Sequence, residues 1–186
     1  ELGDGTEDNR STPVQAVGLN GVVAIAASEY FTVALKNDGT VWAWGANSSG
    51  QLGDGTTNER SVPAQVNGLS GIVSIAAGRH YIAALDRDGT LWSWGQNGEL
   101  ETGAQNAPAR VKGLHGISGV GTSAGYHLVA RTNEGTVFTW GDNVFNQLGF
   151  ASNRATLSAI RTTASPSDTD HDWILDSWEL RYFGNL

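Results

Sequence analysis

The chain repeats itself with a period of 50 residues, and this feature restricts the possible fold more than any other. Residues 1–50 match residues 51–100 without a gap, and 25 of the 50 aligned positions are identical. A third, more divergent copy follows, because Trp140 lies 46 residues after Trp94, and a fourth copy begins at Gln147 and breaks off. Repeats of this length indicate a stacked array in which each unit buries its faces against its neighbours.

Each period contains four short apolar segments, which we interpret as β-strands. In the first copy they cover 13–17, 22–27, 31–36 and 40–45. The Asp38-Gly39 pair predicts a tight hairpin turn, for which we expect the type I′ geometry that needs residues tolerant of positive φ. Four strands per period predict an all-β fold, a partial β-propeller of about three four-stranded blades. A curved β-solenoid is the competing geometry.

The same segments carry a family resemblance. The pattern G-x-x-Y/H-x-x-A-L-x-x-D-G-T-V/L-W-x-W-G-x-N-x-x-G-Q-L-G occurs from Gly78 to Asn97, and in part from Ser28 to Gly53. Through these motifs the chain, from Glu1 to Leu148, resembles the regulator of chromosome condensation repeat family, whose complete members are seven-bladed propellers. The founding member exchanges nucleotide on a small GTPase and binds chromatin, whereas other members resemble pure binding surfaces, including a secreted bacterial inhibitor of β-lactamase. Because one fold hosts many functions, the resemblance implies a propeller rather than a particular activity.

The composition argues against several classes of protein. The absence of Cys excludes disulfides, thiolate catalysis and Cys-ligated zinc. A net charge of −8 argues against DNA or RNA as a partner, because the chain lacks the basic surface that phosphate contacts require. The sequence contains no apolar run of about 18 residues, so it predicts no membrane span. No catalytic motif stands out either, so we expect a protein that is not an enzyme. The start at Glu1, without Met, predicts a processed protein or an excised piece.

Turns of the repeat supply the first candidates for function. Glu29, Arg79 and His127 fall at neighbouring hairpin ends, so we expect them to form a contact surface on the rim of the propeller. The loops Gly3-Asp-Gly-Thr and Gly53-Asp-Gly-Thr resemble anion-binding loops, but they precede no predicted helix. We therefore interpret both loops as structural turns.

The segment from Asp168 to Leu186 departs from the repeat and is dense in carboxylates. Oxygen-bearing side chains occupy positions 1, 3, 5, 9 and 12 of a twelve-residue stretch, the spacing with which calcium loops wrap one ion. The predicted Ca²⁺ ligands are Asp168, Asp170, Asp172, Asp176 and Glu179. The stretch resembles the calcium loops of EF-hands, dockerins and thrombospondin type 3-like repeats found in exported bacterial proteins.

Position 6 of this stretch is Trp173, where calcium loops normally have Gly, so we expect a weak site. An alternative interpretation involves no metal: Asp176 caps the start of a short helix, Glu179 completes the capping box, and the helix ends at Gly184. The two interpretations share the same residues and can coexist. Both predict a short loop-helix segment.

The sequence thus divides into repeats over 1–160, a linker over 161–167, and an acidic calcium-type loop with a short helix over 168–186. We interpret the chain as a non-catalytic recognition scaffold of an exported bacterial repeat protein, located outside the cell or on its surface. Its ligand would be a protein or a glycan. One alternative is an accessory segment of a secreted hydrolase whose catalytic domain lies outside this chain. Another is a propeller that acts as a guanine nucleotide exchange factor.

The number of repeats also bears on partners. Three repeats and a stub cannot close a ring of seven, so two blade faces would be left open. Neither end of the repeat region shows an obvious polar cap in the sequence, and stacked repeats lose an interface at each uncapped end. We therefore expect the remaining propeller blades, or a second copy of the chain, to cover these faces.

Overall fold

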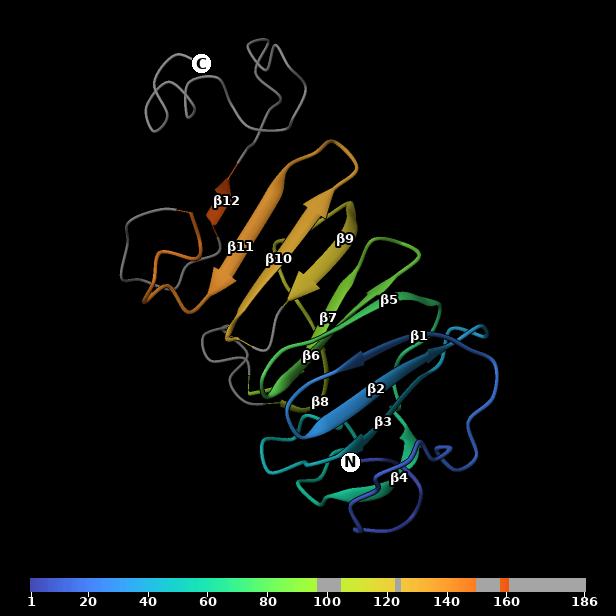
Figure 1. Cartoon of the computed structure of the whole chain (residues 1–186). Helices are drawn as coiled ribbons and strands as arrows, with labels where there is room; N and C mark the ends of the chain where they lie inside the picture. The colour runs from blue at the N-terminus through green and yellow to red at the C-terminus, as the bar shows by residue number, and fades with distance from the viewer. Residues whose placement is uncertain (97–104, 123–124, 150–157, 161–186) are drawn as a thin grey trace, which may run out of the picture.

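A computed structural model describes residues 1–96, 105–122, 125–149 and 158–160, the last of these as backbone only. In this part of the chain, three antiparallel sheets of four strands follow one another along the sequence. We name them blade 1, blade 2 and blade 3; Figure 1 shows them stacked in succession from the blue end of the chain to the orange. The predicted all-β fold with three four-stranded blades is therefore confirmed.

Within each blade, the strands are hydrogen-bonded in the order in which they occur along the chain. Blade 1 contains β1 (Val22–Ala27), β2 (Phe31–Lys36), β3 (Val41–Gly45) and β4 (Arg60–Gln65). Blade 2 contains β5 (Ile72–Ala77), β6 (Tyr81–Asp86), β7 (Leu91–Gly95) and β8 (Gln105–Arg110). Blade 3 contains β9 (Ile117–Thr122), β10 (His127–Thr132), β11 (Val137–Gly141) and β12 (Ser158–Ile160).

The expected strand over 13–17 is not present, and this prediction is wrong. Its counterpart in the second copy, β4, pairs with β3 of the preceding copy, with Ala64 opposite Ala43. Each blade therefore takes its fourth strand from the next period of the sequence. Residues 10–15, which align with β4, have no third strand ahead of them in this sequence with which to pair. The other three predicted strands match β1, β2 and β3 to within one residue.

The hairpin between β2 and β3 also differs from the expected type I′ turn. Its loop has three residues, closed by Lys36 N donating to Thr40 O at 2.9 Å and Gly39 N donating to Lys36 O at 2.9 Å. Only Gly39 in this loop has positive φ, at 80°, which fits a type I turn followed by a left-handed glycine. The carboxylate of Asp38 accepts a hydrogen bond from the backbone N of Thr40, and Asp38 itself does not have a positive φ.

The predicted equivalence of three tryptophans is confirmed. Each is the fourth residue of the third strand in its blade: Trp44 in β3, Trp94 in β7 and Trp140 in β11. All three are at most 5% exposed. The stacking of the sheets buries Trp94 and Trp140, which belong to the cores between blades, whereas Trp44 lies against the N-terminal segment and donates its Nε1 to Glu1 O at 2.8 Å.

Two hydrophobic cores lie between the blades. The first joins Val33 and Leu35 of blade 1 to Ile82 and Trp94 of blade 2. The second joins side chains of blade 2 to side chains of blade 3, and its members include Tyr81, Leu85, Leu128, Ala130 and Trp140. Neighbouring residues of one strand thus face opposite blades, as Ile82 and Tyr81 do, so blade 2 makes apolar contacts on both of its sides.

The loop from β3 to β4 is organised by one buried side chain, Asn47. Its Nδ2 donates to Thr56 O at 3.0 Å and Asn58 O at 2.9 Å, and its Oδ1 accepts from Leu52 N at 2.9 Å. Blade 3 repeats the last of these bonds, because Asn143 Oδ1 accepts from Leu148 N at 3.0 Å. The conspicuous Asn of the repeat pattern is therefore a structural residue.

Candidate functional site

The turns between the first and second strands of the three blades lie in equivalent positions along one edge of the stack. They cover residues 28–30, 78–80 and 125–126, which we call the rim. The first two turns are closed alike, by Ser28 N donating to Phe31 O at 3.0 Å and by Gly78 N donating to Tyr81 O at 2.9 Å. Because each turn is anchored to its own blade, the packing of the blades fixes the distances between turns.

Blades 1 and 2 meet at the rim through Arg79. Its Nε lies 3.8 Å from Glu29 Oε2, and its backbone carbonyl accepts a hydrogen bond from Ser28 Oγ at 3.3 Å. The other carboxylate oxygen of Glu29 accepts from the Tyr30 hydroxyl at 2.5 Å, and this hydrogen bond raises the pKa of Tyr30. About half of each charged side chain is exposed, so the ion pair itself adds little stability.

Blades 2 and 3 meet at the rim through the same residue. The backbone N of Arg79 donates to Gly125 O at 3.2 Å, and its guanidinium lies 5.5 Å from the centre of the Tyr126 ring. The ring of His80 lies 6.0 Å from that of Tyr126, at an angle of 42°. Arg79 is thus the centre of a row of side chains that crosses all three blades.

The sequence placed two of the three predicted rim residues correctly. Glu29 and Arg79 lie together, but Tyr126, and not His127, packs against the guanidinium. His127 is the first residue of β10 and aligns with Phe31, and its backbone carbonyl accepts the Tyr81 hydroxyl at 2.7 Å. The expectation for His127 is therefore wrong. The signal that could have found Tyr126 is its alignment with Tyr30 and His80 in the turn.

The two Asp-Gly-Thr loops are structural, as predicted. In the second, Thr56 N and Arg60 Nε donate to the carboxylate of Asp54 at 2.9 and 2.7 Å. Burial raises the pKa of Asp54, but the hydrogen bonds from Thr56 and the Arg60 guanidinium outweigh it, and the net shift is downward. Asp4 makes the same contacts with Thr6 and Arg10 in the first loop.

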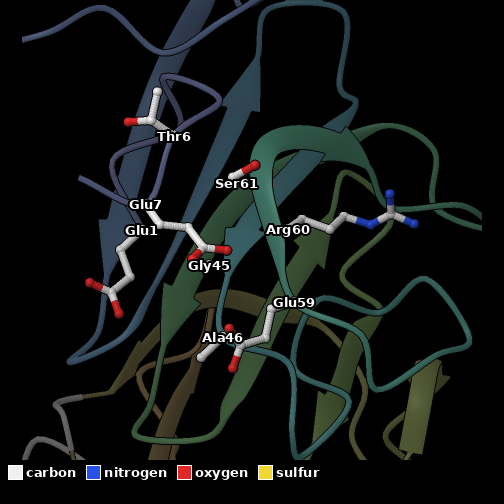
Figure 2. Close-up of a pocket in the computed structure, with 8 residues that line it drawn as sticks. All are labelled: Glu1, Thr6, Glu7, Gly45, Ala46, Glu59, Arg60 and Ser61. Carbon is white, nitrogen blue, oxygen red and sulfur yellow. The ribbon is translucent and has the colours of Figure 1, made fainter.

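A polar hollow of about 290 Å³ opens beside the end of β3. Its lining is Glu1, Thr6, Glu7, Gly45, Ala46, Glu59, Arg60 and Ser61. Figure 2 shows the guanidinium of Arg60 directed away from the carboxylates of the three glutamates. The corresponding place in blade 2 is beside the end of β7. There the loop 47–50 of blade 1 lies over it, and Ser49 Oγ donates to Gln96 Oε1 at 3.2 Å. The hollow therefore corresponds to the place of a loop between repeats rather than to a pocket built for a ligand.

The predicted calcium ligands, from Asp168 to Glu179, lie outside the described residues. The described residues hold no group of three or more His, Cys, Asp or Glu side chains that could bind a metal ion. Nor does this part of the chain contain a helix long and apolar enough to cross a membrane.

Three stacked four-stranded sheets, each with a buried tryptophan in its third strand, define a β-propeller repeat protein. Two models described as the regulator of chromosome condensation (RCC1) repeat match the sequence, one over 38–85 and the other over 22–51, 72–99 and 122–147. Together they cover more than half of the chain. The chain belongs to the RCC1 repeat family.

Solved propellers share the fold. Prp20p from Saccharomyces cerevisiae, described with its binding to Gsp1p and histones, matches 82% of this chain at 24% identity with a TM-score of 0.69. The same yeast RCC1 protein bound to Kap60 gives a TM-score of 0.70 at 24% identity over 84% of this chain. Human WBSCR16 gives 0.63 at 25% identity over 73%. This chain spans 36–41% of the length of those chains.

Proposed function

We propose that the chain is a non-catalytic recognition scaffold whose ligand binds along the rim. The observation that carries this proposal is the continuous row from Glu29 through Arg79 to Tyr126, which crosses all three blades. Its side chains stand on turns that are anchored to antiparallel sheets, and they are at least partly exposed. A rigid support lowers the entropy that binding costs, which suits a surface for recognition.

We favour a protein over a glycan as the ligand. Tyr and Arg are the residue types that most often contribute strongly to protein interfaces, and the rim places both at its centre. Arg79 is positioned by its backbone bond to Gly125 and by the ring of Tyr126, so little side-chain freedom would be lost on binding. The net charge of −8 supports a partner other than nucleic acid.

The proposal includes an extracellular or cell-surface location in a bacterium. Its support is the acidic stretch with the predicted ligands Asp168, Asp170, Asp172, Asp176 and Glu179. A weak calcium site is occupied at the millimolar calcium of extracellular fluids and not at cytosolic levels. The partners also include a further blade or a second copy of the chain on an open blade face.

Nucleotide exchange is not part of the proposal. Prp20p is described as binding Gsp1p and histones, but at 24% identity the likeness extends to the fold alone. This chain also spans only 41% of the length of that protein.

A peptide selection tests the proposal. A random peptide library displayed on phage is selected on the wild-type chain, and the enriched peptides are measured against Arg79→Ala, Tyr126→Ala and the matched control Arg110→Ala, which removes an exposed arginine from β8. We expect binding to weaken in both rim variants and to persist in the control. Peptides that bind all four proteins equally would contradict the rim, and binding on a glycan array without any enriched peptide would replace the protein ligand by a glycan.

A further inference from the structure

The two sides of each blade can be distinguished by the cores that they enter. We call the side that faces the next blade in the chain the forward side, and the opposite one the back side. On the second strand of blade 1 the forward side carries Phe31, Val33 and Leu35, and all three belong to the core shared with blade 2. On blade 2 the forward side carries Tyr81, Ala83 and Leu85, which belong to the core shared with blade 3. All six are at most 2% exposed.

Blade 3 breaks this pattern on its forward side. The equivalent positions of β10 carry His127, Val129 and Arg131, of which the first two are half-buried and Arg131 is exposed. The intervening residues Leu128 and Ala130 face blade 2 and are 2% and 1% exposed. Two of the three forward positions of β10 thus carry polar side chains where blades 1 and 2 carry mainly apolar ones, while the back side keeps the apolar residues of the repeat.

The neighbouring strand β9 fits the same change. Gly119 of β9 aligns with Ala24 of β1, and a Cβ atom built at Gly119 would lie 3.1 Å from Arg131 Nε and 3.3 Å from its Cγ. The side chain of Arg131 therefore lies across the forward side of β9.

We propose that blade 3 ends the stack: its forward side is a polar terminal surface that does not receive another blade of this repeat. A blade packed against it would bury the guanidinium of Arg131, and an ion removed from water without a partner costs several kcal/mol or more. Stacked-repeat proteins need a terminal unit with a polar outer face to remain soluble, and blade 3 has that composition. The polar cap was not evident in the sequence, because it depends on which side of β10 each residue occupies.

Blade 1 has the opposite character on its back side. Ile25 is 75% exposed, whereas its counterparts Ile75 and Val120 pack against the inter-blade cores. The partner that fits this side is a blade with an apolar forward side like that of blades 1 and 2. Continuity with the existing interfaces supports this partner, since Trp44 Nε1 donates to Glu1 O at 2.8 Å as Trp94 Nε1 does to Gln51 O at 2.9 Å. A further blade can therefore pack on the back side of blade 1, but not on the forward side of blade 3.

Sedimentation velocity over a range of protein concentrations tests this polarity. The double variant His127→Phe/Arg131→Leu restores residues of the kind found in blade 1 and gives blade 3 an apolar forward side. We expect it to form assemblies larger than a dimer, because its blade 3 can now stack on blade 1 of another molecule. The substitution Ile25→Glu, added to the double variant, should reverse this growth. The control Arg110→Leu, which places the same leucine on an exposed position of β8, should behave as the wild type.

Two sedimentation results would overturn the proposal. One is a folded double variant, with the circular dichroism of the wild type, whose mass is unchanged. The other is a wild-type chain that already grows beyond a dimer and stops doing so on Arg131→Glu. A second measurement needs no substitution: the rate at which methylglyoxal modifies Arg131, followed by mass spectrometry, should not depend on the concentration of the wild-type protein. Protection of Arg131 at high concentration would show that another molecule covers this side.

Discussion

The indole Nε1 of Trp94 donates a buried hydrogen bond to the backbone carbonyl of Gln51, 2.9 Å away. Gln51 belongs to the loop between β3 and β4 of blade 1, and Trp94 belongs to blade 2, so the bond ties a loop of one blade to the sheet of the next. Leu52, which follows Gln51, is 2% exposed and belongs to the core between the two blades. The second period of the sequence thus begins inside blade 1 and continues into blade 2. The first residues of that period are in contact with both blades and link them.

Replacing this tryptophan tests the tie. We expect Trp94→Phe to lower the free energy of unfolding by about 2–4 kcal/mol, because it removes the indole that donates to Gln51 O and leaves a void in a fully buried site. Trp44→Phe is the matched variant; its partner is Glu1 at the start of the chain, where there is less packing to lose. Urea unfolding of both variants measures the difference. Equal losses of unfolding free energy would contradict a special role of the hydrogen bond between Trp94 and Gln51.

Tyr81 makes a second bond across blades and predicts a response to alkaline pH. Its hydroxyl lies 2.6 Å from Thr122 Oγ1 and donates to His127 O at 2.7 Å, and burial raises its pKa to about 12. Since the pKa is higher in the folded than in the unfolded chain, the stability that it contributes is complete below pH 10. It is then lost as the pH rises through 12.

Tyr81→Phe should reduce this alkaline loss of stability. At pH 8 the variant should lose about 0.5–1.5 kcal/mol through the missing hydrogen bonds, and its stability should then fall less steeply than that of the wild type towards pH 12. Phe31 stands at the same position of blade 1, so the fold accepts the residue. Thermal unfolding at several pH values measures the effect, and parallel curves for the two proteins would disprove it.

Two glycines with similar backbone angles should respond differently to alanine. Gly95 has a φ of 88°, and a Cβ atom there would lie 2.8 Å from Tyr81 Cα, so the third strand cannot pair closely with the second if a side chain is present. Gly68 has a φ of 83° and nothing within 4 Å. We expect Gly68→Ala to cost about 1–2 kcal/mol, the price of the left-handed conformation alone. Gly95→Ala should cost clearly more, and a smaller loss at Gly95 than at Gly68 in urea unfolding would refute the close approach.

The sequence predicted what depends on neighbouring residues and failed where distant segments decide. The strands around Asp38-Gly39 follow from the alternation of apolar residues and the turn that joins them. The strand over 13–17 was overpredicted, because its counterpart β4 forms only by pairing with a third strand from the preceding repeat. Local patterns do not contain that information.

The rim shows the same division. The turns that carry Glu29 and Arg79 could be located from the repeat, but the contact of Arg79 with Tyr126 depends on how tightly the blades stack. The prediction for the third turn was two residues off, because Gly125, and not His127, aligns with Arg79. A row of contacts across three sheets is a property of the stacking distance, which is set by the cores beneath the turns.

The calcium prediction concerns residues outside the described part of the chain and can be tested on the whole protein. Calorimetric titration should detect one Ca²⁺ bound with a dissociation constant of about 10⁻⁶–10⁻³ M, at the weak end because Trp173 lacks the conformational freedom of Gly.

Ca²⁺ affinity depends on the number of charged oxygen ligands, so neutralising one of the three alternating carboxylates should weaken binding strongly. Asp168→Asn should abolish the calorimetric signal, and Trp173→Gly should tighten binding. Asp142→Asn, which removes an acidic side chain from blade 3, is the control and should leave the titration unchanged. Wild-type protein that gives no heat and no change in tryptophan fluorescence up to about 10 mM Ca²⁺, beyond the weakest extracellular sites, would leave the helix cap at Asp176 as the role of these residues.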